Sequence, residues 1–162
     1  MRVSSRTRRE FLVSSAAAAA GLALAPACAT VGGKRSATDL VTLGRTGLRM
    51  SRLGMGCGSN GGSVQRGLGQ EAFNRLVRDA FDRGVRYFDC AQSYKTFEWM
   101  GEAIKGLRRD EIFLLSKIGG NPEKPDEVID RHLKTFGTDR IDCMLVHCAV
   151  TETWTEERAR VM

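Results

Sequence analysis

The chain has 162 residues, of which 42% are hydrophobic and 27% charged, a composition typical of one globular domain rather than of a disordered chain. Its formal net charge is +6, but half of that charge lies in the first 30 residues, whose charged members are Arg2, Arg6, Arg8, Arg9 and Glu10. In the rest of the chain basic and acidic residues alternate, which favours a solvated surface over a nucleic-acid-binding patch.

The cysteines and histidines offer no metal-binding pattern. The chain has two histidines and five cysteines, and no two of the cysteines form a C-x-x-C pair: Cys28, Cys57, Cys90, Cys143 and Cys148. No zinc spacing is therefore available. We expect the cysteines to be small buried hydrophobes rather than disulfides or metal ligands.

Residues 1–30 have the three parts of an export signal. A charged segment that contains Arg8 and Arg9 precedes Phe11, an alanine-rich apolar stretch follows, and small residues around Ala27 provide a cleavage site. The paired arginines resemble a twin-arginine export signal, which the twin-arginine machinery recognises on proteins that have already folded. We therefore expect a periplasmic protein, with residues 31–39 as a linker to the folded domain.

Two alternatives would leave the chain tethered to the membrane. The apolar stretch could be retained as a transmembrane anchor, but it is short, weakly apolar and close to Pro26. Cys28 could instead carry a lipid after processing, although Ala25 stands where a leucine is usual.

Strands and helices alternate from residue 40 onward. The apolar pattern predicts a hairpin at 41–51, followed by strands that alternate with helices. The predicted strands are 53–57, 85–91, 112–117 and 141–147. The predicted helices are 70–83, 97–107 and 125–136, with a fourth beginning near residue 151. The glycine-rich segment 58–63 lacks the order of a dinucleotide-binding fingerprint. Alternating elements with short connections predict an α/β fold with a parallel sheet.

Four ionisable side chains stand at or just after the ends of predicted strands. Asp89, Lys117 and His147 each end a strand, and Tyr94 lies in the loop after the first of these. Parallel strands would gather them at one rim. A tyrosine has a pKa of about 10, which a nearby ammonium lowers, and a carboxylate can hold that ammonium in place. A neutral histidine can orient a carbonyl oxygen, so the set suits carbonyl reduction, with hydride delivered to carbon and a proton to oxygen.

Each of these residues has an ordinary structural explanation by itself. Asp89 could cap a helix or pair with an arginine, Tyr94 could anchor a loop, Lys117 could be solvated, and His147 could be a buried, hydrogen-bonded histidine. Their order along the chain and their positions at strand ends favour the functional interpretation.

Four segments of this chain resemble the aldo-keto reductase family. LGRTGLRMSRLGMG at 43–56 is similar to the opening hairpin and first strand of that family, and FDCAQSY at 88–94 to its acid and tyrosine segment. Residues 98–117 match its next helix and lysine strand, and residues 142–147 match its histidine strand.

The resemblance implies a (β/α)8 barrel of TIM type that uses NADP(H). It makes Tyr94 the proton donor, with Lys117 and Asp89 tuning it and His147 orienting the substrate carbonyl. It also places Gly56, Cys57 and Asp89 near the nicotinamide ribose.

Such a barrel needs about 250 residues, and residues 40–162 provide about the first four of its eight β/α units. We therefore expect the N-terminal half of an NADP(H)-dependent aldo-keto reductase that acts on an aldehyde or ketone. It would be truncated, joined by a second half-barrel chain, or self-associated through its open sheet edges. The alternatives are a non-catalytic half-barrel that serves binding or assembly, an inactive fragment, or another barrel enzyme, such as an isomerase that uses Lys117 or His147.

Overall fold

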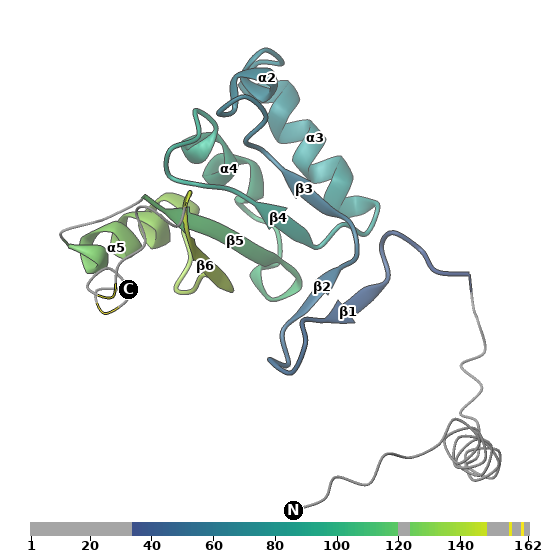
Figure 1. The fold of residues 1–162 in the computed structure, drawn as a ribbon. Coiled ribbons are helices and arrows are strands. Elements are labelled where there is room, and N and C mark those ends of the chain that lie inside the picture. The colour runs from purple at the N-terminus through teal and green to yellow at the C-terminus, as the bar shows by residue number, and fades with distance from the viewer. Residues whose placement is uncertain (1–33, 120–123, 149–155, 157–159, 161–162) are drawn as a thin grey trace, which may run out of the picture. The chain divides into compact units, whose positions relative to one another are not determined.

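The computed structural model describes residues 34–119, 124–148, 156 and 160 (Figure 1). The predicted export signal lies outside these residues, as does Cys28. Of the predicted fourth helix only Glu156 and Arg160 are described, and both are helical. Within the described part of the chain, every helix is too short or too polar to cross a membrane.

The predicted hairpin is confirmed as an antiparallel pair, β1 (Leu40–Thr42) and β2 (Arg49–Ser51). Its turn contains Gly44 and Gly47, whose positive φ angles of 52° and 78° suit glycine. The Ser51 hydroxyl then accepts the backbone N–H groups of Arg86 and Tyr87, at 2.8 and 3.2 Å. These bonds attach the end of the hairpin to the beginning of the strand at residues 87–89.

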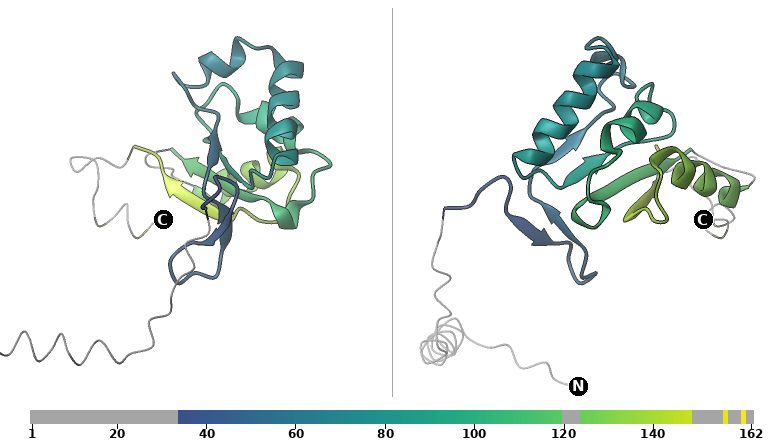
Figure 2. Two further views of the ribbon diagram at one scale, coloured as in Figure 1. Left: turned by 90° about the vertical axis from the view of Figure 1, so that its right-hand side faces the viewer. Right: turned by 180° about the vertical axis from the view of Figure 1, so that it is seen from behind.

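The core of the domain is a parallel sheet with helices on one face. Its strands follow chain order: β3 (Gly54–Gly56), β4 (Tyr87–Asp89), β5 (Phe113–Ile118) and β6 (Cys143–Val146). Figure 2 shows α3 (Gln70–Asp82), α4 (Phe97–Ile104) and α5 (Pro125–Phe136) together on one side of this sheet. The prediction of an α/β parallel fold is confirmed, and four parallel strands in chain order, with helices on one face, are consistent with part of a (β/α)8 barrel.

The elements differ from the predicted ranges in three main places. A short helix, α2 (Ser63–Arg66), forms at the end of the predicted glycine-rich loop, after Gly62 with a φ of 87°. Strand β4 ends at Asp89 rather than at residue 91, because the chain turns and the Tyr94 N–H donates to the Ala91 carbonyl at 3.0 Å. A single turn of 3-10 helix, η1 (Arg109–Glu111), also precedes β5.

The helix-covered face of the sheet holds the hydrophobic core. Phe73 and Val77 of α3 and Phe97 and Met100 of α4 are fully buried against it. Helix α4 also approaches α5 closely, because a Cβ added at Gly101 would lie 2.2 Å from the Thr135 carbonyl oxygen. Glycine at this position therefore sets how near the two helices lie.

One of the two histidines belongs to this core. His132 of α5 is fully buried, its Nδ1 lies 2.7 Å from the Val128 carbonyl, and its ring packs edge-on against Phe97. Burial lowers the pKa of His132. This side chain is therefore a packing residue in the core on the helix-covered side of the sheet.

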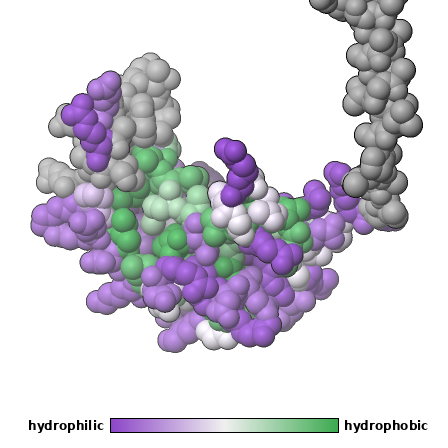
Figure 3. Space-filling model, turned by 90° about the horizontal axis from the view of Figure 1, so that it is seen from below, coloured by the Kyte–Doolittle hydropathy of each residue, from purple (hydrophilic) through white to green (hydrophobic). Residues whose placement is uncertain are grey.

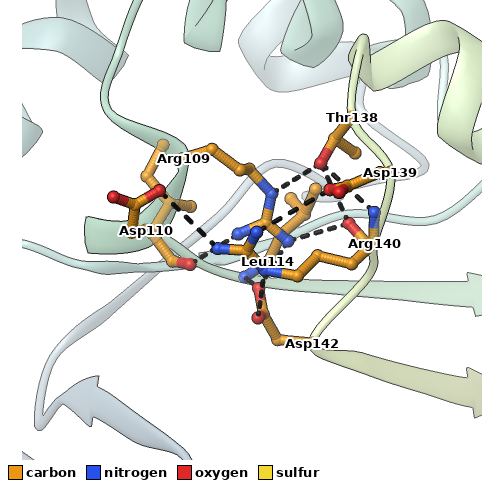
Figure 4. A network of polar contacts seen from close by, with 8 residues as sticks. Arg109, Asp110, Leu114, Thr138, Asp139, Arg140 and Asp142 are labelled. Carbon is orange, nitrogen blue, oxygen red and sulfur yellow. Dashed lines mark hydrogen bonds and ion pairs between the residues drawn. The ribbon is translucent and has the colours of Figure 1, made fainter.

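A polar network ties β5 to β6 near their amino ends (Figure 4). The Arg109 guanidinium donates to the Asp142 carboxylate at 2.7 Å and to the backbone carbonyls of Ile112 and Arg140, each at 2.8 Å. The same carboxylate accepts the Leu114 N–H at 2.8 Å. Both charged side chains are mostly buried, so the pair is screened little by water.

The other face of the sheet is only partly covered. Tyr87 and Phe113 pack edge to face on it, with ring centroids 5.4 Å apart, whereas Leu145 of β6 is 42% exposed. Figure 3 shows a hollow in which apolar residues gather, bordered by hydrophilic ones. Among the described strands, β3 and β6 are the outer ones and each pairs on one side only.

We expect the Arg109→Ala variant to lose about 3 kcal/mol of unfolding free energy, because it leaves the Asp142 carboxylate buried without its partner. Chemical denaturation of the two proteins measures the difference. Arg83→Ala is a matched control: its ion pair with Asp79 is as short, at 2.8 Å, but exposed, and its loss should cost less than about 1 kcal/mol. Equal losses in the two variants would contradict this account of the network.

Candidate active site

The structure gathers the four predicted side chains at one rim of the sheet. Asp89 is the last residue of β4, Lys117 is the penultimate residue of β5, and His147 follows β6 directly. Tyr94 lies in the loop that leaves β4. Register supports the arrangement, because Asp89 pairs with Leu115 and Lys117 pairs with Leu145. Because residues two apart in a strand share a face, Asp89, Lys117 and His147 all lie on the face of the sheet that carries no helices.

An ion pair between Lys117 and Asp89 forms the centre of the site. The Lys117 ammonium donates to the Asp89 carboxylate and, at 3.0 Å, to the Cys90 carbonyl oxygen. Burial by itself would lower the pKa of Lys117, but the hydrogen bond and charge of Asp89, together with Tyr94, outweigh it and raise that pKa. The lysine is therefore a fixed positive charge at neutral pH.

Tyr94 lies over this ammonium. The Lys117 Nζ is 5.1 Å from the centroid of the Tyr94 ring. The ring also lies so close to Gly58 that a Cβ there would be 2.2 Å from two ring carbons. Gly58 is therefore required for the position of the phenol, a contact that the sequence analysis did not identify.

His147 closes the site on the β6 side. Its ring meets the Tyr94 ring edge to face, with centroids 5.4 Å apart, and its backbone N–H donates to the Ile118 carbonyl at 2.8 Å. The Nδ1 atom lies 3.1 Å from the Ser93 hydroxyl, which leaves Nε2 for another partner. Ser93 was not predicted, because no feature of the sequence distinguishes it from other polar loop residues.

The positions predicted to lie near a nicotinamide ribose occupy both faces of the sheet. Gly56 pairs in register with Asp89, and no atom lies within 4 Å of a Cβ added to it, so a flat ring has room beside it. The Cys57 side chain is fully buried on the helix side and belongs to the hydrophobic core. Only the Cys57 backbone can therefore border this space, whereas the Asp89 carboxylate is half-buried within it.

The described residues form no metal site, and they form a pocket away from the rim. In residues 34–119 and 124–148 with Glu156 and Arg160, no three His, Cys, Asp or Glu side chains lie close enough together to hold a metal ion. A pocket of about 300 Å³ lies between the ends of α4 and α5, lined by Gly101, Arg109, Lys134 and Phe136 among others. It lies on the helix side, by the amino ends of β5 and β6, and is separate from the rim.

Comparison with known proteins identifies a family match. The model of the Aldo/keto reductase family matches residues 52–162. The 7-acetyl-epi-neemfruitin B aldo-keto reductase of Melia azedarach is 38% identical over 120 residues, which cover 68% of this chain and 35% of that protein. The aldo-keto reductase YhdN of Bacillus subtilis is 29% identical over 139 residues, covering 76% of this chain and 42% of that protein.

Solved structures agree with the sequence match. A thermostable aldo-keto reductase, Tm1743, solved with the inhibitor epalrestat, superposes with a TM-score of 0.63 and 30% identity over 76% of this chain and 47% of that one. The holo form of aldo-keto reductase AKR11C1 from Bacillus halodurans superposes with a TM-score of 0.53 and 28% identity, over 65% and 39% of the two chains. The chain thus spans less than half the length of each of these relatives.

We expect the Lys117→Met substitution to lower the free energy of unfolding by about 2 kcal/mol at neutral pH, because the ammonium's hydrogen bonds to Asp89 and Cys90 are lost. A lysine pKa raised by folding stabilises the folded state below the ordinary value of 10.5. That stabilisation disappears as the pH rises through the raised value. The gap between the two proteins should therefore narrow above pH 10.5 in denaturation curves measured across pH.

Lys95→Met is the matched control for this pH series. Lys95 is exposed and its ammonium contacts the Ser63 hydroxyl at 3.1 Å. Its replacement should change stability little at any pH. A gap for Lys117→Met that stays constant across the alkaline range would show that the ion pair does not act as described.

Proposed function

The chain belongs to the aldo/keto reductase family, and we propose that it carries the proton-transfer residues of an NADP(H)-dependent oxidoreductase that reduces an aldehyde or ketone to an alcohol. The observation that supports this proposal is the placement of the Tyr94 ring against the Lys117 ammonium, which is itself paired with Asp89. A fixed positive charge beside the phenol can stabilise the negative charge that develops on its oxygen during proton transfer.

In the proposed reaction the Tyr94 hydroxyl donates a proton to the substrate carbonyl oxygen. The Lys117 ammonium stabilises the tyrosinate that remains, and Asp89 holds the ammonium in place. When bound, NADP(H) supplies the hydride that the carbonyl carbon accepts. Removing Lys117 would leave the tyrosinate without this charge, and removing Asp89 would leave the ammonium without the carboxylate that holds it in place.

His147 orients the carbonyl in this proposal. Its Nδ1 faces the Ser93 hydroxyl at 3.1 Å, and if that hydroxyl donates, the proton of the neutral ring lies on Nε2. A protonated Nε2 beside the Tyr94 ring can donate to a carbonyl oxygen and stabilise the charge that develops there. Ser93 is thus a positioning residue for His147.

The described residues fit the nicotinamide end of the cofactor. Gly56 leaves open space beside the half-buried Asp89 carboxylate, and the backbone of Cys57 borders the same end of β3. We propose Gly56, Cys57 and Asp89 as the residues near the ribose. The space and the polar group agree with that assignment, which comes from the family resemblance.

We further propose that turnover needs the second half of the barrel, supplied by a continuation of this chain, by another chain or by a second copy of this one. The outer edges of β3 and β6 and the 42%-exposed Leu145 side chain support this proposal, because unpaired parallel strands favour association. The same observations favour the other candidate function, a half-barrel that serves binding or assembly without catalysis. Native mass measurement with NADPH fluorescence titration separates the two: a monomer that binds no nucleotide would favour the second.

The proposed location is the periplasm, reached through the twin-arginine machinery. The support is the paired Arg8 and Arg9 before an alanine-rich segment. Replacing both arginines with lysine should keep the full chain in the cytoplasm, as cell fractionation and immunoblotting would show. Undiminished export of that variant would contradict the proposal, and membrane recovery of the parent would point to a retained anchor or to lipid on Cys28.

We expect the Tyr94→Phe variant to lose at least about 10²-fold in turnover, because phenylalanine keeps the ring over Lys117 and Gly58 but has no proton to donate. Nucleotide affinity should stay nearly unchanged. The measurements are steady-state reduction of a test aldehyde and NADPH fluorescence titration, on the assembly that binds nucleotide.

Tyr87→Phe is the matched control, since the chain has two tyrosines. Tyr87 lies on the same face of the sheet, packs against Phe113 and lies outside the rim. Its variant should keep normal turnover. Full activity in Tyr94→Phe would remove this residue from the mechanism.

A further inference from the structure

Two cysteines lie side by side directly beneath the rim, on the helix-covered face. Gly56 of β3 pairs in register with Asp89 of β4. The residues that follow them, Cys57 and Cys90, are therefore neighbours as well. The Cys57 N–H donates to the Asp89 carbonyl at 3.2 Å, which continues the ladder to this position. Both side chains are fully buried in one hydrophobic cluster.

The backbone geometry suits a covalent link between the two. Neighbouring strands of a sheet lie about 4.8 Å apart, and a disulfide requires a Cα separation of about 4.4 to 6.8 Å. Cys57 and Cys90 extend to the same face of the sheet and belong to the same buried cluster. The spacing of the two strands is therefore compatible with a disulfide between these residues.

The two thiols differ chemically. The hydrogen bond from Cys90 lowers the pKa of Cys57 despite its burial, whereas the same bond and burial raise the pKa of Cys90. The thiolate is the reactive form of cysteine. The lowered pKa favours Cys57 as the thiol that reacts first, and Cys90 lies next to its product.

We propose that Cys57 and Cys90 form an oxidisable dithiol, which a peroxide converts to a disulfide between the ends of β3 and β4. The Cys57 sulfur attacks one peroxide oxygen, the O–O bond breaks, and the departing hydroxide takes up a proton to become water. The Cys90 sulfur then attacks the sulfenic sulfur of Cys57, the S–O bond breaks, and a second water leaves with the Cys90 proton. Two thiols and one hydrogen peroxide give one disulfide and two waters.

This modification site is separate from the proposed reductase activity, which uses neither thiol group. It adjoins that site through the backbone: the Asp89 carbonyl accepts the Cys57 S–H at 3.1 Å, and the Cys90 carbonyl accepts the Lys117 ammonium at 3.0 Å. Oxidation removes the Cys57 S–H donor and links the end of β3 to the end of β4, which carries Asp89. Formation of the link requires only the folded chain, so it is measurable whether or not the chain reduces a carbonyl.

The experiment treats the folded full chain with hydrogen peroxide, stops the reaction, unfolds the chain and alkylates the remaining thiols with iodoacetamide. Intact mass then counts the alkylated thiols, and peptide mapping without reductant locates any link. We expect two fewer alkylated thiols and one linked pair of peptides containing Cys57 and Cys90. Both effects should be reversed by dithiothreitol.

Variants of the other cysteines provide the controls. Cys143 is half-buried on the opposite face, and Cys148 is exposed. Cys143→Ser and Cys148→Ser should keep the loss of two thiols, whereas Cys57→Ser should abolish it. If the Cys57→Ser variant does not fold, peptide mapping of the unaltered chain still tests which cysteines are linked.

Three outcomes would overturn the proposal. The first is a link that joins Cys143 or Cys148, or two separate chains. The second is oxidation of Cys57 to sulfinic acid without a link to Cys90. The third is a pair that forms only at denaturant concentrations above the unfolding transition, which would show that the folded arrangement does not bring the thiols together.

Discussion

The ion pair between Lys117 and Asp89 joins the fold of this protein to its proposed chemistry. It spans the carboxyl ends of two neighbouring parallel strands, and the lysine also binds the Cys90 carbonyl just beyond β4. A lysine at the end of so apolar a strand must be paired to remain charged. Its partner holds that charge where the Tyr94 ring lies over it. The position of the phenol and the protonation of the lysine therefore depend on the same contact.

Close approach at glycines determines the geometry around this pair. The Tyr94 ring has its place only because Gly58 has no side chain, and α4 lies near α5 only because Gly101 has none. The helix contact supports the core beneath β4 and β5, and the loop contact keeps the phenol above them. Both contacts act by steric exclusion, since the repulsion between atoms rises steeply over a few tenths of an ångström. Polar contacts such as Ser93 with His147 then set orientation within that frame.

The two faces of the sheet carry different chemistry because side chains alternate along a strand. Asp89, Lys117 and His147 share the face without helices, where charged and polar groups can reach a substrate. Cys57 and Cys90 each follow a strand by one residue and therefore extend to the helix side, fully buried. This alternation separates a proton-transfer site from an adjacent dithiol. Burial explains why the cysteines resemble ordinary core residues in the sequence.

Local pattern in the sequence was sufficient for the order of elements and for the four rim residues. Apolar runs and helical spacing identified β3 to β6 and α3 to α5, and parallel strands place their carboxyl ends together without further information. Only the tertiary structure decided that Gly58 receives the Tyr94 ring, that Ser93 reaches His147, and that Cys57 meets Cys90. These contacts join residues 33 to 54 positions apart or depend on the path of a loop. The sequence does not encode such contacts as a period or a motif, because they depend on which loop folds over which strand.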